Sequence, residues 1–406
     1  MDGNARALAA SFDLERLTPE FYANPYPTYR ALRESEPVKQ LPNGTWFLTR
    51  YDDLVTAYKN TKAFSSDKKR EFLPKYGNSL LYEHHTTSLV FNDPPAHTRV
   101  RRLIMGALSP RAIASMEGDL VALVDRLLDA IAAKGRVDVI EDYAAAIPIE
   151  VIGNLLGVPH DEREPLRDWS LAILGALEPV IGEEAFARGN SAVKDFLAYL
   201  ESLVERRRAR PGNPERDVLT RLIQGEENGE RLNEKELLHN CIFLLNAGHE
   251  TTTNLIGNGL VALFEHPAER RRLIENPDLI KTAVEEVLRY ESSNQLGNRM
   301  TTERITLGDV TLDEGTSVTL CIGAANRDPA QFPDPERFDV GRNPNRHLAF
   351  ATGPHQCAGM ALARLEGAIA IARFLKRFPN YALAGQPVRG GRVRFRGFLR
   401  VPCSIG

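Results

Sequence analysis

One cysteine, between two glycines near the end of the chain, is the side chain best placed to do chemistry. The sequence there is Phe350-Ala-Thr-Gly353-Pro-His355-Gln-Cys357-Ala-Gly359, and we expect a helix over residues 357–374. Backbone N–H groups and the macrodipole at a helix start favour a thiolate, so the pattern predicts a lowered pKa for Cys357. Glycines let backbone pass close to a flat, bulky group, and Phe350 can shield the sulfur from water. Such a cysteine is typical of an axial thiolate ligand to a haem iron.

Two simpler interpretations of Cys357 compete with this one. A lone cysteine near a helix start is commonly a small buried hydrophobe. His355 and Cys357 together could supply half of a zinc site, but no second cysteine or histidine pair follows at zinc spacing. The haem interpretation is favoured because five other segments fit it independently.

The cysteine segment resembles the ligand loop of the cytochrome P450 monooxygenases, whose pattern is Phe-x-x-Gly-x-x-x-Cys-x-Gly. Phe350, Gly353, Cys357 and Gly359 fill every position of that pattern. Related features run from about residue 24 to residue 402, so the resemblance spans nearly the whole chain. It implies that Cys357 binds the iron of haem b (iron protoporphyrin IX), and that the other three residues and His355 contact the cofactor.

The resemblance also implies a fold that is mainly α with a minor β portion, the cytochrome P450 fold. The haem would lie between a long helix around residues 233–265 and the cysteine helix. We expect one domain over residues 1–406, because no linker, repeat or charge block divides the chain. Its β-rich portion should lie mainly in residues 37–50, 300–320 and 380–403.

The longest helical pattern carries the run Ala247-Gly248-His249-Glu250-Thr251. Ala247, Gly248 and Thr251 share a helix face, and small residues there let a flat cofactor approach. The Thr251 hydroxyl can bond a carbonyl one turn back, and Glu250 can relay protons. The run resembles the oxygen-binding groove of the family, which implies that Thr251 hydrogen-bonds dioxygen and that Glu250 is the acid of the relay. The alternative is a tolerated threonine run beside a solvated Glu250.

Two opposite charges, Glu286 and Arg289, lie three residues apart on one helix face. The simplest interpretation is a surface ion pair. The resemblance instead implies a buried triad in which Arg337 is the third member. This triad would lock the scaffold of the cysteine loop, and the loss of any member would be costly.

Several cations could hold the carboxylates of a cofactor. His97 and Arg101 project from one face of an expected helix. The resemblance implies that both residues, with Arg299 and His355, contact the haem propionates, and arginine suits this role because it donates a fork of N–H groups. A His-x-x-x-Arg pattern taken alone is more often a solvated helix face.

Bulk composition excludes other classes of protein. Lys and Arg number 51 against 54 Asp and Glu, and the net charge of −3 gives no reason to expect nucleic-acid binding. Four widely spaced cysteines suit a reducing cytoplasm. The N-terminus lacks the features of a signal peptide, and polar residues interrupt the apolar stretch 241–264, so no membrane span is predicted. We expect a cytoplasmic monomer.

The predicted function is that of a haem-thiolate monooxygenase, which inserts one atom of O2 into a small organic substrate. No flavin or iron–sulfur module is recognisable, so the electrons should come from a separate ferredoxin with an NAD(P)H-dependent reductase. A peroxygenase driven by hydrogen peroxide and a non-catalytic haem sensor or binding protein remain open. The Glu250–Thr251 pair argues against both, because neither needs a proton relay.

Two surfaces follow from the resemblance. The substrate pocket should include Phe243, Asn246, Ala247, Asn294, Gln295, Asn298 and Phe398. Its four amides predict an oxygenated or nitrogenous substrate, unless they hydrogen-bond the backbone instead. A docking face for an acidic ferredoxin is expected on the cysteine side, around Arg99, Arg102, Arg342, Arg346 and Arg364.

Overall fold

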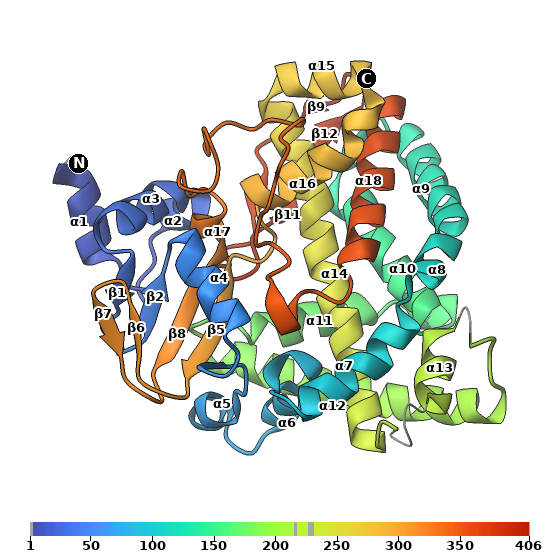
Figure 1. Ribbon diagram of the computed structural model, residues 1–406. Coiled ribbons are helices and arrows are strands. Elements are labelled where there is room, and N and C mark those ends of the chain that lie inside the picture. The colour runs from blue at the N-terminus through green and yellow to red at the C-terminus, as the bar shows by residue number, and fades with distance from the viewer. Residues whose placement is uncertain (1–2, 215–216, 226–230, 406) are drawn as a thin grey trace.

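The structure, a computed structural model, describes residues 3–214, 217–225 and 231–405. Helices form most of it, and a sheet lies to one side beside the N-terminal helices (Figure 1). The prediction of a mainly α fold with a minor β portion is therefore confirmed.

The helices surround the long helix α14, which crosses the middle of the molecule (Figure 1). In chain order they are α1 (Gly3–Ser11), α2 (Pro19–Ala23), α3 (Tyr26–Ser35), α4 (Tyr51–Lys59), α5 (Lys69–Tyr76), α6 (Leu80–Thr87), α7 (Ala96–Ala107), α8 (Pro110–Ser115), α9 (Glu117–Ala132), α10 (Ala146–Leu155), α11 (Leu166–Gly175), α12 (Glu183–Ala209), α13 (Val218–Gln224), α14 (Glu234–Glu265), α15 (Pro267–Glu275), α16 (Ile280–Tyr290), α17 (Ile322–Ala325) and α18 (Met360–Arg377). Shorter turns are η1 (Leu89–Phe91), η2 (Ile140–Ala144), η3 (His160–Glu162), η4 (Pro277–Leu279) and η5 (Gly353–His355).

The strands form one sheet of five strands and three smaller ones. The largest sheet has the order β1-β2-β8-β5-β3, in which only β2 and β8 run parallel to each other. The strands are β1 (Val38–Gln40), β2 (Trp46–Leu48), β3 (Phe64–Ser65), β4 (Arg136–Asp138), β5 (Leu296–Thr301), β6 (Ile305–Leu307), β7 (Val310–Leu312), β8 (Ser317–Cys321), β9 (Ala382–Leu383), β10 (Val388–Arg389), β11 (Phe398–Arg400) and β12 (Pro402–Ser404). Strands lie in the three regions where the sequence predicts them, and β3 and β4 lie outside those regions.

Helix α14 starts and stops where its flanking residues dictate. Asn233 caps it through a capping box with Glu236, and Pro267 follows its last turn. The helix packs against α10, α11, α16 and α18, so most of its side chains are buried. The predicted range of 233–265 for the long helix is confirmed. Among the residues that the structure describes, no helix is long and apolar enough to cross a membrane.

The cysteine helix begins later than the sequence predicts. Helix α18 starts at Met360 with Gly359 as its N-cap, and it continues to Arg377. Cys357 therefore lies in the loop before the helix, not in its first turn. The loop holds this shape because the N–H of Cys357 donates to the carbonyl of Phe350 at 2.9 Å, which closes a turn ahead of the helix.

Candidate active site

The cysteine loop is tightly folded against α4. Gly353 has a φ of +74°, and a Cβ at this position would lie 2.7 Å from the carbonyl oxygen of Tyr58. Only glycine fits such a position, because it tolerates both the left-handed backbone and the close approach. Phe350 packs beneath the guanidinium of Arg364, whose carbon lies 4.9 Å from the ring centroid. The pattern of glycine and phenylalanine around Cys357 thus has a direct structural cause.

The thiol of Cys357 does not have the lowered pKa that the sequence predicts. Burial raises its pKa, while a hydrogen bond from the Gly359 backbone and the positive charges of Arg101 and Arg364 act in the opposite direction. The prediction is wrong for the free thiol because the sulfur lies ahead of the helix in an enclosed site. A metal ion deprotonates a coordinating thiol regardless of this shift. The bias toward the thiolate therefore depends on the metal, with the two arginines assisting.

One face of α14 is directed toward α18. Ala247, Thr251 and Leu255 recur at intervals of four residues, and a Cβ on Gly367 of α18 would lie 2.9 Å from Leu255 Cδ2. The Thr251 hydroxyl donates to the carbonyl of Ala247 at 2.7 Å, which confirms the predicted bond one turn back. Ala247 itself is exposed although it lies in the middle of the central helix. A face of small and hydroxyl side chains is therefore presented above the cysteine helix.

Gly248 also has a packing role. A Cβ at this position would clash with Ile152 of α10. The glycine thus allows α10 and α14 to pack closely, and its contact with a cofactor stays a prediction.

Glu250 is buried, so the interpretation as a solvated charge is wrong. Its carboxylate accepts two hydrogen bonds from Nη1 of Arg392, at 2.6 and 2.8 Å, and Nη2 of the same arginine donates to the Leu171 carbonyl at 3.2 Å. The pKa of Glu250 is raised to about 7, chiefly by burial; the charge of Arg392 opposes this rise and that of Glu178 adds to it. A carboxyl that titrates near neutrality can both accept and donate a proton. Sequence reasoning missed Arg392, because no local pattern links it to a residue 142 positions earlier.

Two histidines and two arginines lie near the cysteine loop, namely His97, His355, Arg101 and Arg299. The rings of His97 and His355 lie 3.9 Å apart between centroids, and Nη2 of Arg101 donates to the Gln356 carbonyl at 2.6 Å. Burial, with nearby cations that include Arg299 and Arg101, lowers the pKa of His97 to about 4 and that of His355 to about 2. These are the four residues that the sequence predicts to contact propionates.

These four residues leave buried polar atoms without partners. Both ring nitrogens of His97, Nε2 of His355 and Nε of Arg299 have no hydrogen-bond partner. Buried polar atoms are rarely left unpaired, so a group carrying several acceptors fits this edge of the site. The two carboxylates of a haem supply such acceptors. The residues present therefore fit a haem whose propionates face His97, His355 and the two arginines.

Comparison with known proteins supplies the family. The family model for cytochrome P450 matches residues 38–386. This chain is a cytochrome P450. It is 38% identical over 370 residues to the biotin biosynthesis cytochrome P450 of Bacillus subtilis, covering 90% of this chain and 92% of that protein. It is 36% identical over 408 residues to 6-deoxyerythronolide B hydroxylase of Saccharopolyspora erythraea, covering 97% of this chain and 98% of the other.

Solved structures confirm the fold of this P450. The crystal structure of P450BioI, in complex with an acyl carrier protein ligated to hexadec-9Z-enoic acid, matches with a TM-score of 0.90 at 36% identity. The match covers 95% of this chain and all of that one. Membership of the family implies a haem cofactor and oxidoreductase activity, since the relatives include named hydroxylases and monooxygenases.

The buried ion pair of this P450 has a different third member from the one predicted. Glu286 and Arg289 are fully buried and 2.8 Å apart. Arg342 completes the cluster, with its Nε 3.1 Å from Glu286 Oε2, and Asn345 donates to the same carboxylate at 3.0 Å. Arg337 does not join them, because its side chain is 61% exposed and reaches only Asp339, at 4.0 Å. The prediction of Arg337 is therefore wrong.

Arg337 contributes only its backbone to that cluster. Its carbonyl accepts from Arg289 at 3.0 Å and from Arg342 at 3.1 Å. Arg337 and Arg342 lie within six residues of each other, and only the side chain of Arg342 is directed toward Glu286. Spacing in a single sequence carries no information about which of the two does so.

The predicted substrate pocket divides into two groups. Asn298 donates to Thr319 Oγ1 at 3.2 Å and accepts from Arg394, and Gln295 is fully buried and donates to the Ser292 carbonyl at 2.8 Å. The Nε2 group of Gln295 thus bonds the backbone, as in the alternative interpretation, while Asn298 bonds two side chains. Asn246 keeps both amide atoms unpartnered, and Asn294 and Gln295 each keep the amide oxygen unpartnered.

The remaining predicted pocket residues are apolar. Phe243 is half-buried against the main core, while Phe398 is buried beneath the guanidinium of Arg389 at 3.9 Å. Of the predicted polar pocket residues, those with an unpartnered amide atom are Asn246 in α14 and Asn294 and Gln295 in the segment before β5.

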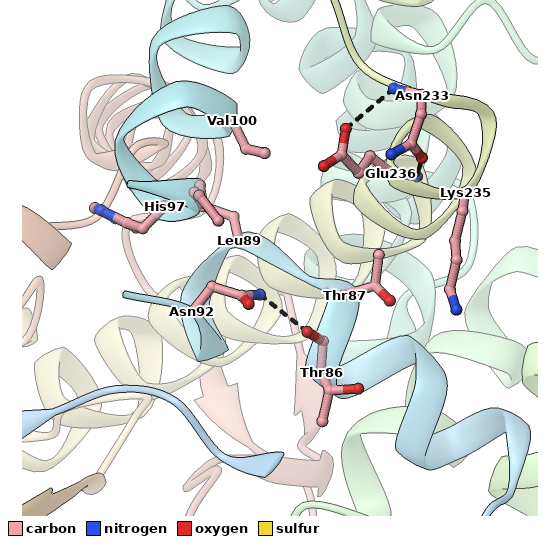
Figure 2. Close-up of a pocket in the computed structure, with 10 residues that line it drawn as sticks. Thr86, Thr87, Leu89, Asn92, His97, Val100, Asn233, Lys235 and Glu236 are labelled. Carbon is pink, nitrogen blue, oxygen red and sulfur yellow. Dashed lines mark hydrogen bonds between the residues drawn. The ribbon is translucent and has the colours of Figure 1, made fainter. Parts of the chain in front are cut away.

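A separate cavity of about 230 Å³ lies between α6, α7 and the start of α14 (Figure 2). Figure 2 shows His97 at its edge, with the ring directed away from Lys235 and Glu236. The cavity is lined by Thr86, Thr87, Leu89, Asn92, Ala96, His97, Val100, Asn233, Lys235 and Glu236. It adjoins the propionate-facing residues but does not include Cys357 or Thr251.

Proposed function

We propose that this P450 binds haem b through Cys357 and inserts one atom of O2 into a small organic substrate. The observation that supports this most directly is the placement of the Thr251 hydroxyl and the buried Glu250 on a helix that packs against the cysteine helix. When bound, the haem supplies the activation of O2. The chain supplies the thiolate, the proton path and the orientation of the substrate.

The proton path runs through Glu250 and Thr251. Glu250 has a pKa of about 7 because it is buried, so it exchanges protons readily at neutral pH. Arg392 holds its carboxylate from the solvent side and keeps the carboxyl oriented. Thr251 presents its hydroxyl on the face above α18, and its bond to Ala247 fixes where that hydroxyl lies. With haem and O2 bound, Glu250 would exchange protons with the solvent side and the Thr251 hydroxyl would supply a proton on the face above α18.

The two alternatives, a peroxygenase and a haem sensor, do not require the whole of this proton path. A peroxygenase driven by hydrogen peroxide has no need of protons delivered to O2, and a haem sensor has no need of turnover. The deciding experiment compares product formed with a surrogate ferredoxin, reductase and NAD(P)H against product formed with hydrogen peroxide alone. The proposal expects the first system to be the faster. Equal or faster turnover with peroxide supports a peroxygenase, and no turnover in either supports a sensor.

The substrate should carry polar groups. Asn246 is buried, with neither amide atom hydrogen-bonded, on the same face of α14 as Glu250. Such an amide rejects a ligand that lacks a partner group, because its own atoms then stay unpaired. An oxygenated or nitrogenous ligand should therefore bind more tightly than a plain hydrocarbon of the same shape, which the shift in haem absorption on titration measures.

The electrons should come from a separate ferredoxin that docks on the cysteine side of a cytoplasmic monomer. Ion pairs use three of the five arginines predicted for this face: Arg99 pairs with Glu236, Arg342 with Glu286 and Arg364 with Glu285. These ion pairs reduce the positive electrostatic potential of the docking face. We therefore expect the rate of reduction by a ferredoxin to depend moderately on salt. Stopped-flow reduction by a ferredoxin across a salt series tests this, with Arg346→Glu as the variant that should slow reduction. A rate that neither salt nor this reversal changes would place docking elsewhere.

A further inference from the structure

Two cations lie side by side at the C-terminal end of α11. Nζ of Lys75 donates to the carbonyl of Glu178 at 2.6 Å, and Nε of Arg394 donates to the carbonyl of Leu177 at 3.0 Å. These carbonyls belong to consecutive residues, so α5 and the C-terminal segment bring their positive charges to one place. Both side chains are half-buried.

Within the part of the chain that the structure describes, no carboxylate forms a direct ion pair with Lys75 or Arg394, although the charges of Glu71 and Glu178 raise the pKa of Lys75 against the effect of burial. The Nη atoms of Arg394 donate to the Leu296 carbonyl at 3.0 Å and to Asn298 Oδ1, and both acceptors are neutral. Glu71, four residues before Lys75, pairs with Lys68 at 2.7 Å, and the carboxylate of Glu178 accepts from the backbone N–H groups of Val393 and Arg394, at 3.0 and 3.2 Å. Lys75 has only the backbone carbonyl as its acceptor.

Two buried arginines elsewhere have a carboxylate partner. Arg289 pairs with Glu286 at 2.8 Å, and Arg163 pairs with Glu150 at 2.6 Å. A half-buried cation without an anion is costly, because neither water nor an opposite charge compensates its desolvation. Consistent with this cost, burial and then the charge of Arg394 lower the pKa of Lys75 to about 8.

A buried histidine adjoins the two cations. His85 is 2% exposed, and its Nε2 has no hydrogen-bond partner. Its ring lies 5.5 Å from that of Tyr76, whose hydroxyl donates to the carbonyl of Ala176 at 2.6 Å. His85 therefore lies beside the same short segment that holds Lys75 and Arg394. Burial, followed by the charges of these two residues, lowers its pKa to about 3, so the ring is neutral and can donate one N–H.

Apolar rings continue from the histidine. Phe72 and Phe91 each lie 5.7 Å from the His85 ring, and they contact one another at 5.2 Å. On the other side, Arg394 is two residues from Arg392, which holds Glu250. The cations thus lie near His85 and its aromatic neighbours, and Arg394 belongs to the same short segment as Arg392.

We propose that Lys75, Arg394 and His85 bind an acidic group, a carboxylate or a phosphate ester, at one end of a substrate with an apolar body. This inference rests on the proposed function, because it takes the space beside α14 as the substrate site. The simpler alternative is that the two cations only cap the carbonyl end of α11. The alternatives differ in whether removal of a cation changes affinity for acids alone.

The test measures binding to the haem-loaded protein by calorimetry, without turnover. Dodecanoate and dodecyl phosphate are compared with 1-dodecanol, which has the same chain but no charge. At least one of the two anions should bind roughly tenfold or more tightly than the alcohol, as expected for charge-assisted hydrogen bonds. Arg394→Gln should reduce this ratio to near one while leaving the affinity for the alcohol within about twofold. Lys75→Gln is the second variant, should the first fail to fold.

Arg270→Gln is the matched control, because Arg270 also bonds a carbonyl, that of Tyr381, at 3.0 Å and lies in α15. It should leave the ratio unchanged. Equal binding of acids and alcohol by the unmodified protein, no binding of either anion, or an equal loss of all ligands in both variants would overturn the inference. Failure of the proposed function is a separate result: ligands would bind with the expected ratio, yet no O2-dependent product would form.

Discussion

The ionic cluster around Glu286 on the cysteine side and the proposed substrate side of this P450 differ in whether their buried polar atoms have hydrogen-bond partners. On the cysteine side, the carboxylate of Glu286 is fully buried and accepts hydrogen bonds from Arg289, Arg342 and Asn345. On the substrate side, between α5, α6, α11 and residues 392–398, Asn246 and His85 keep buried polar atoms without partners. The Glu286 carboxylate is fully paired within the chain, whereas we expect the amide of Asn246 to be paired only when a ligand binds.

This difference separates scaffold from recognition. A satisfied ionic cluster has one low-energy arrangement, so it holds the loop of Cys357 in a fixed place. Unpaired donors and acceptors cost free energy in the folded chain and recover it on binding a ligand that pairs them. The comparison therefore predicts that mutations on the cysteine side chiefly change stability, and that mutations on the substrate side chiefly change what is bound and how electrons are used.

The largest effect is expected at Glu286. Glu286→Ala leaves Arg289 and Arg342 buried without their anion, which should cost about 3–5 kcal/mol. The midpoint of thermal unfolding should fall by about 4–6 °C. Arg337→Ala is the control, because its exposed side chain lies outside the cluster and should change stability by less than about 0.5 kcal/mol. If both substitutions lowered stability equally, Arg337 would belong to the buried triad and the contrast between the two sides would be wrong.

Thr251 should show the opposite behaviour. Thr251→Ala should fold, bind haem and bind substrate as the unmodified protein does, because the hydroxyl bonds only the Ala247 carbonyl. The loss of ordered proton delivery should divert electrons to hydrogen peroxide, and product formed per NAD(P)H consumed should fall to about a tenth. Thr251→Ser keeps a hydroxyl and should recover most of the coupling. Full coupling in the alanine variant would remove Thr251 from the proton path.

Glu366 is an exception on the cysteine side, and it gives a smaller effect that depends on pH. Its side chain on α18 is buried with Oε2 unpartnered, and burial raises its pKa to about 8. Because the folded pKa exceeds the usual 4.5, the stability from the protonated form is fully present below pH 4.5 and is lost as pH rises through about 8.

The expected slope for Glu366 is about 1.4 kcal/mol per pH unit within that window. Glu366→Gln cannot ionise, so unfolding midpoints measured from pH 5 to pH 8 should fall less steeply in this variant than in the unmodified protein. Identical slopes would show that Glu366 does not titrate there.

The bond from Thr251 to Ala247 and the ends of the long helix could be predicted from the sequence, but the start of the cysteine helix and the pKa of Cys357 could not. The loop from Phe350 to Gly359 and the run from Ala247 to Thr251 are contiguous, and each carries its geometry in neighbouring residues. The long helix was predictable because Asn233 and Pro267 mark its two ends. The overall fold followed from the family resemblance that these segments carry.

Features that depend on distant contacts were missed. Arg392 reaches Glu250 across 142 positions, and Arg394 reaches Asn298 across 96. Neither pairing has a periodicity or spacing that a sequence displays. The raised pKa of Cys357 has the same origin, because burial is a property of the folded chain and outweighed the local effect of the nearby helix start.

The central claim is that the Cys357 thiolate binds the haem iron, and the spectrum of the reduced protein with carbon monoxide tests it most directly. The unmodified protein should show the red-shifted Soret band that thiolate ligation produces. Cys357→His should lose that band, even where the variant retains haem between α14 and α18. A band that is unchanged in the variant, or absent from the unmodified protein with haem bound, would contradict the account.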